Sequence, residues 1–538
     1  MARRLRRTGE PVFAAFATCL WLSLAAGSPA YGAAPPPPEL FARGASFMSA
    51  ALSPDGNSIV YIAHPQGRRI VAVRTIGQPG SDRAILAGEA GKDGNFVVNR
   101  CWFKTDRRIL CHYTGTDFGY GQPFNVTRIV ALDADGGNVK VLVQRGAAGA
   151  SQFQDRIVSP LPDDPSGILV ALDAERDVYP SVYRLDVFTG ALKLVQAQRS
   201  PVLYWMADRR GAVRFGYGFK EHRGVYIARD SAEGEWRTLL KFERFDTDRF
   251  EPLGFTELPG RMLVSSEHHG RDAIWELDLR DQADLELVYA HPEADVGRVV
   301  TWPTDERVVG FAYHTDLPQL HLFDASAAAM QADIDKLLPG AVNRFVSASR
   351  DGRRLLVFSY GDTRSGAYYL LDIGNQSLKA VGLAQDSLRD VALAPMRAIR
   401  VPGPGGISIP GYLTLPPGRG ERNLPAVVLP HGGPYARDTW GYDSLVQLLA
   451  SRGYAVLQVN YRGSTGYGAA WLNAGMQKLG TVMHDDITTG ARWLVSQGIA
   501  DATRMAIVGW SYGGYMAQMG AIKEPGLYRC AASIAGLS

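Results

Sequence analysis

A turn-and-strand pattern that recurs from about residue 50 to residue 390 constrains the fold of this chain more than any other feature. Each copy has a polar turn rich in Asp and Gly, followed by a short run of apolar strand residues. The clearest copies begin at Ser53-Pro54-Asp55-Gly56 and at Ser349-Arg350-Asp351-Gly352. Successive copies start about 45 to 50 residues apart, which is the length of a four-stranded propeller blade.

Seven copies of this pattern fit between Ala50 and Asp390, and a closed ring is the arrangement that buries them best. A four-stranded sheet alone leaves both of its faces in water, whereas sheets packed radially cover one another. A β-sandwich or several small β domains would not require a near-constant period. One helical pattern, over residues 326–338, interrupts the strands. We therefore predict an all-β propeller of seven blades over residues 50–390.

The pattern changes after Val391, where apolar runs typical of strands alternate with helical ones. The expected strands cover residues 426–429, 454–461, 505–510 and 530–535, and the expected helices cover residues 444–451, 486–497 and 512–523. Alternation of this kind gives right-handed βαβ units and a parallel sheet. Ligands of such sheets bind at the carboxyl ends of the strands, so motifs at those positions are the most informative about function.

A G-x-S-x-G motif, Gly509-Trp510-Ser511-Tyr512-Gly513, lies between an expected strand and an expected helix. Its glycines allow a turn too sharp for Cβ atoms on either side, and such a turn holds the serine Oγ exposed above the sheet. In a chain with 59 glycines, the motif alone could be a glycine-rich helix start. Its place between strand and helix favours a nucleophile elbow, so we predict Ser511 as the nucleophile of a serine hydrolase.

A second glycine motif, His431-Gly432-Gly433-Pro434, follows the expected strand 426–429. Hydrolases with this elbow hold the oxyanion of the tetrahedral intermediate with two backbone N–H groups. One belongs to the residue after the nucleophile, here Tyr512, and the other to a glycine-containing loop after an earlier strand. His431 precedes the serine, against the Ser–Asp–His order of this fold, so we interpret it as shaping the loop rather than as the general base.

Two other segments of this region are interpreted as structural. The stretch from Asn460 to Gly468 is a glycine-rich loop at the edge of the sheet, and it lacks the Lys-Ser/Thr ending of a phosphate-binding loop. Asp485 and Asp486 stand where the next helix is expected to begin. Acidic side chains stabilise a helix N-terminus through the helix dipole, which explains the pair without a catalytic role.

Three of these segments, in this order and spacing, resemble the prolyl oligopeptidase family of serine peptidases, above all its dipeptidyl-peptidase and acylaminoacyl-peptidase branches. They are His431–Pro434, Asn460–Gly468 and Gly509–Ala517. The resemblance implies an N-terminal propeller followed by an α/β-hydrolase domain, here residues 391–538. It further implies a peptidase that cleaves oligopeptides through an acyl-enzyme intermediate.

The resemblance also implies roles for single residues. Ser511 would be acylated, and the backbone amides of Gly433 and Tyr512 would form the oxyanion hole. The Tyr512 side chain would line the pocket for the residue before the scissile bond. No Cys/His cluster has the spacing of zinc ligands, and we expect neither a metal nor an organic cofactor.

The chain departs from the family after the nucleophile. In the family the acid and the histidine of the triad follow the serine, whereas the residues after Ser511 include neither Asp nor His. We therefore expect that the hydrolase domain lacks its C-terminal part, and that the chain as written is inactive or nearly so. In known triads, loss of one member lowers turnover by ~10⁴–10⁶-fold.

Two other functions remain open at this stage. One is an esterase that uses the same elbow on small esters, although a simple esterase does not need a long propeller. The other is a propeller binding module attached to an inactive hydrolase remnant, which the missing triad residues favour. The net charge of +3 is close to balance, so neither nucleic acid nor an anionic membrane is expected as a partner. A peptide substrate is expected instead, and the sequence does not specify an oligomeric state.

The N-terminus is typical of an export signal. Four arginines precede an apolar stretch over residues 12–27, and small residues follow at Ala30 and Gly32. A membrane anchor is the alternative, but the stretch is shorter than the ~20 residues that span a bilayer. We predict a signal peptide over residues 1–32, a Pro-rich linker over 33–49, and a periplasmic or secreted protein without stable membrane insertion after cleavage.

Two cysteines, Cys101 and Cys111, flank a turn-like segment and could lie opposite each other on a hairpin. In an exported protein they could form a disulfide. Two small buried thiols in neighbouring strands are the other interpretation.

Overall fold

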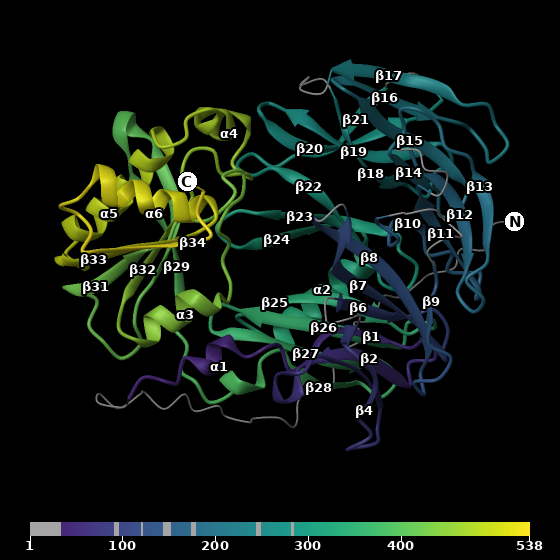
Figure 1. The fold of residues 1–538 in the computed structure, drawn as a ribbon, viewed down its shortest axis with the longest axis horizontal. Helices are drawn as coiled ribbons and strands as arrows, with labels where there is room; N and C mark the ends of the chain where they lie inside the picture. Colours follow the sequence, from purple (N-terminus) through teal and green to yellow (C-terminus); the bar gives the residue numbers. More distant parts are fainter. Residues whose placement is uncertain are drawn as a thin grey trace, which may run out of the picture.

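The computed structural model describes residues 34–90, 96–119, 122–143, 152–173, 179–243, 249–280 and 284–537. The predicted signal peptide, residues 1–32, lies outside these ranges. The described chain forms two lobes, a ring of β-sheets and an α/β domain, which lie side by side (Figure 1). None of the helices within the described ranges has the length and apolar character needed to cross a bilayer.

Seven antiparallel sheets, each built from consecutive strands, form the ring, and they confirm the predicted seven-bladed propeller. Blade 1 contains β1 (Met48–Leu52), β2 (Ser58–Ala63), β3 (Ile70–Thr75) and β4 (Arg83–Ala87). Blade 2 contains β5 (Glu89–Ala90), β6 (Phe96–Phe103), β7 (Arg108–Gly119), β8 (Gln122–Asp133) and β9 (Lys140–Val141). Blade 3 contains β10 (Ile157–Ser159), β11 (Gly167–Leu172), β12 (Ser181–Asp186) and β13 (Leu192–Gln196).

The remaining four blades follow the same order along the chain. Blade 4 contains β14 (Tyr204–Ala207), β15 (Val213–Lys220), β16 (Arg223–Ala228) and β17 (Arg237–Glu243). Blade 5 contains β18 (Glu251–Phe255), β19 (Arg261–His268), β20 (Arg271–Asp278) and β21 (Leu285–Tyr289). Blade 6 contains β22 (Val296–Thr301), β23 (Val308–His314) and β24 (Pro318–Leu322). Blade 7 contains β25 (Val342–Ala348), β26 (Arg354–Gly361), β27 (Arg364–Asp372) and β28 (Ser377–Leu383).

The blades pack together because successive side chains of a strand point to opposite faces of the sheet, and each face contacts a different neighbouring blade. In β2, Ile59 packs against blade 7 and the next residue, Val60, packs against blade 2. In β7, Ile109 packs against blade 1 and Leu110 against blade 3. All four side chains are fully buried. Continuous apolar runs in the sequence therefore mark strands that are covered on both faces.

The ring closes where the two clearest copies of the repeated turn meet. The backbone N–H of Arg350, in the turn of blade 7, donates to the carbonyl oxygen of Pro54 in blade 1 at 2.7 Å. The Arg354 guanidinium donates to the carbonyl oxygen of Gly56 at 2.9 Å, and Leu52 N–H donates to Ser347 Oγ at 2.9 Å. Blades 1 and 7 are thus joined by turn and side-chain hydrogen bonds.

The helix expected over residues 326–338 is α2 (Ala325–Leu337), which follows the three-stranded blade 6. Asp324 caps its N-terminus by accepting a hydrogen bond from Ala327 N–H at 2.8 Å. Ile334 is buried against Leu355 and Val357 of blade 7. The helix therefore packs onto the neighbouring blade.

The second lobe is a six-stranded sheet in the order β29-β30-β32-β31-β33-β34, and its last four strands are parallel. Its strands are β29 (Met396–Pro402), β30 (Ser408–Thr414), β31 (Leu424–Val428), β32 (Ala455–Val459), β33 (Ala500–Trp510) and β34 (Cys530–Ile534). Its helices are α3 (Ser444–Ser451), α4 (Ala469–Gly475), α5 (Val482–Ser496) and α6 (Tyr512–Lys523). Helices α5 and α6 cover one face, and α3 covers the other (Figure 1).

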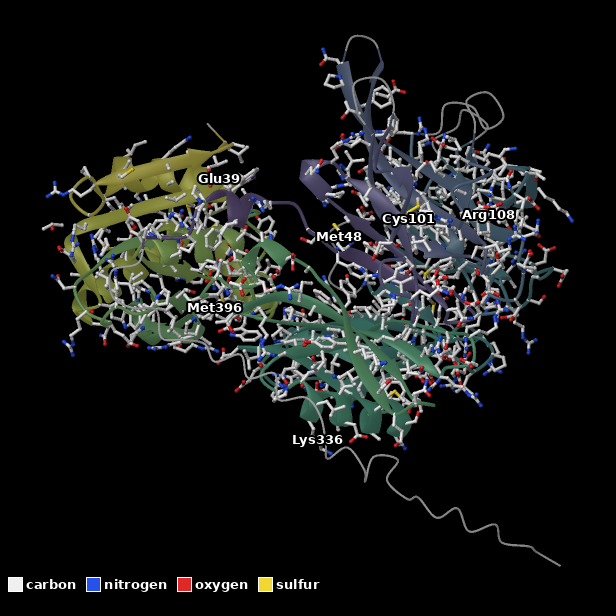
Figure 2. All side chains as sticks on the ribbon, turned by 90° about the horizontal axis from the view of Figure 1, so that it is seen from below. Glu39, Met48, Cys101, Arg108, Lys336 and Met396 are labelled. Carbon is white, nitrogen blue, oxygen red and sulfur yellow. A yellow bond between two sulfur atoms is a disulfide. The ribbon has the colours of Figure 1, made fainter. Side chains whose placement is uncertain are left out.

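Part of the segment predicted as a linker docks on the α/β lobe. Residues 39–42 form the short helix α1 (Glu39–Ala42), and its Phe41 is 4% exposed. The Arg452 guanidinium, at the end of α3, lies 5.7 Å from the Phe41 ring and donates to the carbonyl oxygen of Pro36 at 2.8 Å. Glu39 accordingly lies beside the α/β lobe and Met48 in the propeller (Figure 2). The chain touches the second lobe before it enters the first.

Cys101 and Cys111 form a disulfide between β6 and β7. The two residues are direct partners in the antiparallel register of these strands, so their side chains lie on the same face of the hairpin. The bond lies near the Cys101 label in Figure 2. Of the two interpretations that the sequence left open, the structure has the disulfide.

Candidate active site

Ser511 occupies a sharp turn between the end of β33 and the start of α6, with φ 55° and ψ −121°. A positive φ is strained for a residue with a Cβ atom, and such strain is typical of nucleophile elbows. The flanking glycines explain how the turn forms. A Cβ atom on Gly509 would lie 2.1 Å from the Gly513 carbonyl oxygen, and one on Gly513 would lie 2.1 Å from the Pro430 carbonyl oxygen.

The elbow is fixed by its neighbours and remains partly open to solvent. Ser511 N–H donates to the Ile534 carbonyl oxygen of β34 at 2.9 Å, and Tyr515 N–H donates to the Ser511 carbonyl oxygen at 3.1 Å. The Ser511 residue is half-buried. The turn therefore holds the hydroxyl at the carboxyl edge of the sheet without enclosing it.

The loop after β31 lies against this elbow. A Cβ atom on Gly432 would lie 3.1 Å from the Trp510 carbonyl oxygen and 3.5 Å from Ser511 Cβ, so a larger residue here would push against the elbow. The next residue, Gly433, is exposed and has φ 127°. Tyr512 is the first residue of α6, where backbone N–H groups have no partner within the helix. The structure thus brings together the three residues that the sequence analysis assigned to one site.

The Tyr512 side chain has a different setting from the expected pocket wall. It is 1% exposed, and its hydroxyl lies 2.9 Å from Met483 Sδ in α5. Its ring lies 5.5 Å from the Tyr515 ring and 6.1 Å from the Tyr461 ring, measured between centroids. Burial raises the pKa of this hydroxyl above its usual range. Among the described residues, the Tyr512 ring is a core side chain rather than an exposed surface.

The His431 side chain contacts the loop after β32. Its Nε2 lies 2.8 Å from Ser464 Oγ, and its ring stacks on Tyr461 with centroids 4.3 Å apart. Burial lowers the pKa of its imidazole to about 4. This setting agrees with the interpretation of His431 as a residue that shapes the loop.

The explanation of Asp485 and Asp486 by the helix dipole is wrong for Asp486. Helix α5 begins at Val482, four residues earlier than expected, so Asp486 lies in the second turn. It is fully buried and binds Arg462, accepting from the backbone N–H at 2.9 Å and from Nη2 at 2.6 Å. The ion pair anchors the Asn460–Gly468 loop, a long-range role that its sequence position does not reveal.

Both loops at this edge of the sheet contact the propeller. The Arg437 guanidinium lies 4.1 Å from the Tyr467 ring centroid and donates to the Thr315 carbonyl oxygen at 3.3 Å. From blade 5, Arg271 Nη1 donates to the Tyr467 carbonyl oxygen at 2.7 Å. These contacts with the propeller have no local sequence signal, because the partners are separated by 122 and 196 positions.

A cavity of about 330 Å³ lies between the two lobes, next to these contacts. It is lined by blades 6 and 7 and by the segment from Arg437 to Asp443. Asp438 belongs to its wall, and Asp438 Oδ2 is shielded from solvent without a hydrogen-bond partner among the described residues. Burial, with the nearby charge of Asp443, raises the pKa of the Asp438 carboxyl to about 7.

Comparison with known proteins gives consistent results along the chain. Residues 440–538 match the prolyl oligopeptidase family. Dipeptidyl aminopeptidase BIII of Pseudoxanthomonas mexicana is 28% identical over 523 residues, which cover 93% of this chain and 72% of that protein. Dipeptidyl peptidase family member 6 of Caenorhabditis elegans is 25% identical over 538 residues, which cover 93% of this chain and 70% of that protein.

Solved structures share the two-lobed fold. The structure of a puromycin-hydrolyzing peptidase from Mycobacterium tuberculosis matches 94% of this chain and 80% of its own, with a TM-score of 0.65 and 18% identity. At that identity, the match concerns the fold, a propeller followed by an α/β-hydrolase domain.

Proposed function

We propose that this chain, whose residues 440–538 match the prolyl oligopeptidase family, is a serine peptidase that cleaves oligopeptides by acyl transfer to Ser511 Oγ. In this reaction Oγ attacks the scissile carbonyl carbon and loses its proton to a general base. The peptide C–N bond then breaks, the amine leaves with a proton, and water hydrolyses the ester. The observation that carries the proposal is the strained, half-buried Ser511 with Gly432 packed against it.

The proposed oxyanion hole consists of the backbone N–H groups of Gly433 and Tyr512. Both residues border the elbow, and one of them begins a helix whose N-terminal dipole favours a negative charge nearby. Removal of one such donor in other hydrolases lowers kcat by ~10²–10³-fold. The propeller contacts of the Arg437 and Tyr467 loops support a further part of the proposal, that the ring restricts access and favours short peptides over folded proteins.

A fluorophosphonate probe tests the nucleophile directly in the product of the complete reading frame. We expect labelling of wild-type protein and none of Ser511→Ala, because the probe forms its covalent bond with an activated serine. Turnover of a peptide anilide is then compared with that of a small ester of the same acyl group. Labelling that persists in Ser511→Ala excludes Ser511 as the nucleophile. Ester turnover without anilide turnover favours the esterase.

We also propose that residues 34–538 alone are nearly inactive. The Ser511 hydroxyl needs a base to accept its proton, and the 27 residues after it include no His. Loss of a triad member lowers turnover by ~10⁴–10⁶-fold. Purified residues 34–538 should therefore show peptide turnover close to the uncatalysed rate. Turnover by these residues at an ordinary enzyme rate of about 10 s⁻¹ would overturn the proposal.

Export to the periplasm or the medium is our proposal for localisation. It rests on the arginines and apolar stretch of residues 1–32, and the Cys101–Cys111 disulfide supports it because such bonds persist in oxidising compartments. Cell fractionation with N-terminal sequencing tests it. A mature chain that begins shortly after Gly32, in the exported fraction, is expected. A cytoplasmic chain that retains residues 1–32 contradicts it.

A further inference from the structure

We propose that His431 is a positioning residue that aims the Gly433 N–H at the oxyanion by holding the carbonyl oxygen of Gly432. The inference rests on the proposed function of Ser511. It assigns His431 a defined tautomer and a defined effect on one amide, which goes beyond a general role in the shape of the loop.

The first step is the tautomer of the imidazole. His431 Nδ1 lies 2.8 Å from the carbonyl oxygen of Gly432. A carbonyl oxygen can only accept a hydrogen bond, so this contact requires the proton on Nδ1. The Tyr461 hydroxyl also lies 3.2 Å from Nδ1, but it has the His431 carbonyl oxygen, 3.0 Å away, as its acceptor. The low pKa of the buried ring makes it neutral at pH 7, and a neutral imidazole has only this one proton. Nε2 is therefore an acceptor.

The second step is the partner of Nε2. Ser464 Oγ lies 2.8 Å from Nε2 and is fully buried, so its hydroxyl can donate to the ring. The same oxygen lies 2.7 Å from the Tyr461 carbonyl oxygen. The Tyr461 carbonyl oxygen also accepts a hydrogen bond from Trp471 Nε1 at 3.0 Å. It therefore keeps a hydrogen-bond donor when the Ser464 hydroxyl donates to His431 instead. Because Nε2 faces Ser464, His431 has no free acceptor to offer Ser511.

The third step links the ring to the amide. Across a trans peptide bond, the C=O and N–H groups point in opposite directions. Gly432 C=O and Gly433 N–H belong to the same peptide unit, so a fixed oxygen fixes the direction of the N–H. The oxygen is held by His431, whose ring contacts the fully buried Tyr461 and Ser464, whereas Gly433 is exposed and Gly432 lies against Ser511. The N–H is thereby turned toward the open side next to the nucleophile.

Neighbouring residues also hold the His431 ring in place. Tyr461 stacks on His431 and donates its hydroxyl to the His431 carbonyl oxygen at 3.0 Å. Ser464 and Tyr461 belong to the loop and strand end that the buried Asp486 anchors through Arg462. The His431 ring is thus held on its face and at both nitrogens. A residue that sets the direction of a catalytic amide needs such support, because its own position must be fixed.

Two substitutions separate the two nitrogens of the ring. The side-chain amide of His431→Asn reaches the position of Nδ1 and can still donate to Gly432 O, whereas that of His431→Gln reaches the position of Nε2. In the product of the complete reading frame, we expect His431→Gln to lower kcat about 10- to 100-fold with KM changed less than about twofold. His431→Asn should keep kcat within about fivefold of wild type. Thermal unfolding of both variants controls for loss of fold.

Equal kcat values for the two variants, whether both normal or both lowered, would overturn the inference. A second measurement does not depend on turnover, namely the ¹⁵N NMR spectrum of protein labelled at histidine, which distinguishes the tautomers. A protonated Nδ1 on His431 is expected, and a protonated Nε2 contradicts the inference. Unchanged turnover in Ser511→Ala would instead overturn the proposed function, and the kinetic part of the inference with it. The two failures are therefore distinguishable.

Discussion

Asp486 and Arg462 form a two-pronged ion pair across 24 positions of the chain, with Nη2 2.6 Å from Oδ1 and Nε 2.9 Å from Oδ2. The Asp486 side chain is fully buried, while the Arg462 side chain is 22% exposed. Breaking a buried pair by removing one partner leaves the other charge uncompensated. This pair therefore fixes the loop that carries Ser464 and Tyr467.

Asp486→Asn tests how much the loop depends on this pair. We expect a loss of about 2–4 kcal/mol in the free energy of unfolding, because the amide cannot accept both guanidinium bonds. Urea unfolding followed by fluorescence measures it. The exposed Asp485, whose substitution Asp485→Asn leaves the Arg462 pair intact, is the matched control. Equal stability of the two variants would contradict the role given to Asp486.

Gly509 and Gly513 are expected to be indispensable to the elbow. A methyl group at either position would lie 2.1 Å from a backbone oxygen, so the turn itself must move. A displacement of about 1 Å at a reacting group can lower its rate ~10²-fold. We expect Gly509→Ala and Gly513→Ala to slow fluorophosphonate labelling of Ser511 by about that factor. The rate constant of labelling is the measurement.

Gly420 provides the control for that comparison. A Cβ atom there would meet no heavy atom within 4 Å. Gly420→Ala should label at the wild-type rate. If Gly513→Ala labels as fast as Gly420→Ala, the close packing of Gly513 under Pro430 does not matter for the geometry of the nucleophile.

Much of this architecture could be predicted because it is encoded locally. Helices α3 and α6 span the residues that the apolar pattern indicated, and α3 begins after Asp443, whose carboxylate accepts from two backbone N–H groups of its first turn. The elbow was predictable for the same reason, since the two glycines that it requires stand beside the serine. The repeated Asp-Gly turn likewise identified the blades one by one.

The errors and omissions involve contacts between distant residues. Helix α5 starts four residues earlier than expected, and Thr481 before it makes no side-chain capping bond that a pattern search could detect. Asp486 was misjudged because its partner belongs to another loop. The contacts of Arg437 and Tyr467 with the propeller depend on how the two lobes pack, and no local pattern encodes that. The hydrogen bond from Nδ1 of His431 depends on a side-chain rotamer, which also has no sequence signature.

The Cys101–Cys111 disulfide should contribute to the stability of blade 2. It closes a short loop, with a separation of 10 positions. The loss of chain entropy in the unfolded state then amounts to about 2–3 kcal/mol. We expect the double substitution of both cysteines by serine to lower the free energy of unfolding by that amount. Denaturation of wild-type protein with and without reductant should give the same difference, and coincident curves would show that the bond does not stabilise the propeller.

Asp438 should make the stability of the protein depend on pH near neutrality. In the folded protein the pKa of its carboxyl is about 7, well above the value of 3.8 expected for an aspartate in the unfolded chain. Between these values the folded state holds a proton that the unfolded state has lost, so stability falls as the pH rises toward and through 7. The loss of stability between pH 5 and pH 8 should be about 2–3 kcal/mol.

Asp438→Asn cannot titrate and should remove this part of the pH dependence, whereas Asp390→Asn, at an exposed position, should leave it unchanged. Urea unfolding of the three proteins across this range measures the slope. If the free energy of unfolding depends on pH in the same way for wild type and Asp438→Asn, then burial and the nearby Asp443 do not raise the pKa of Asp438.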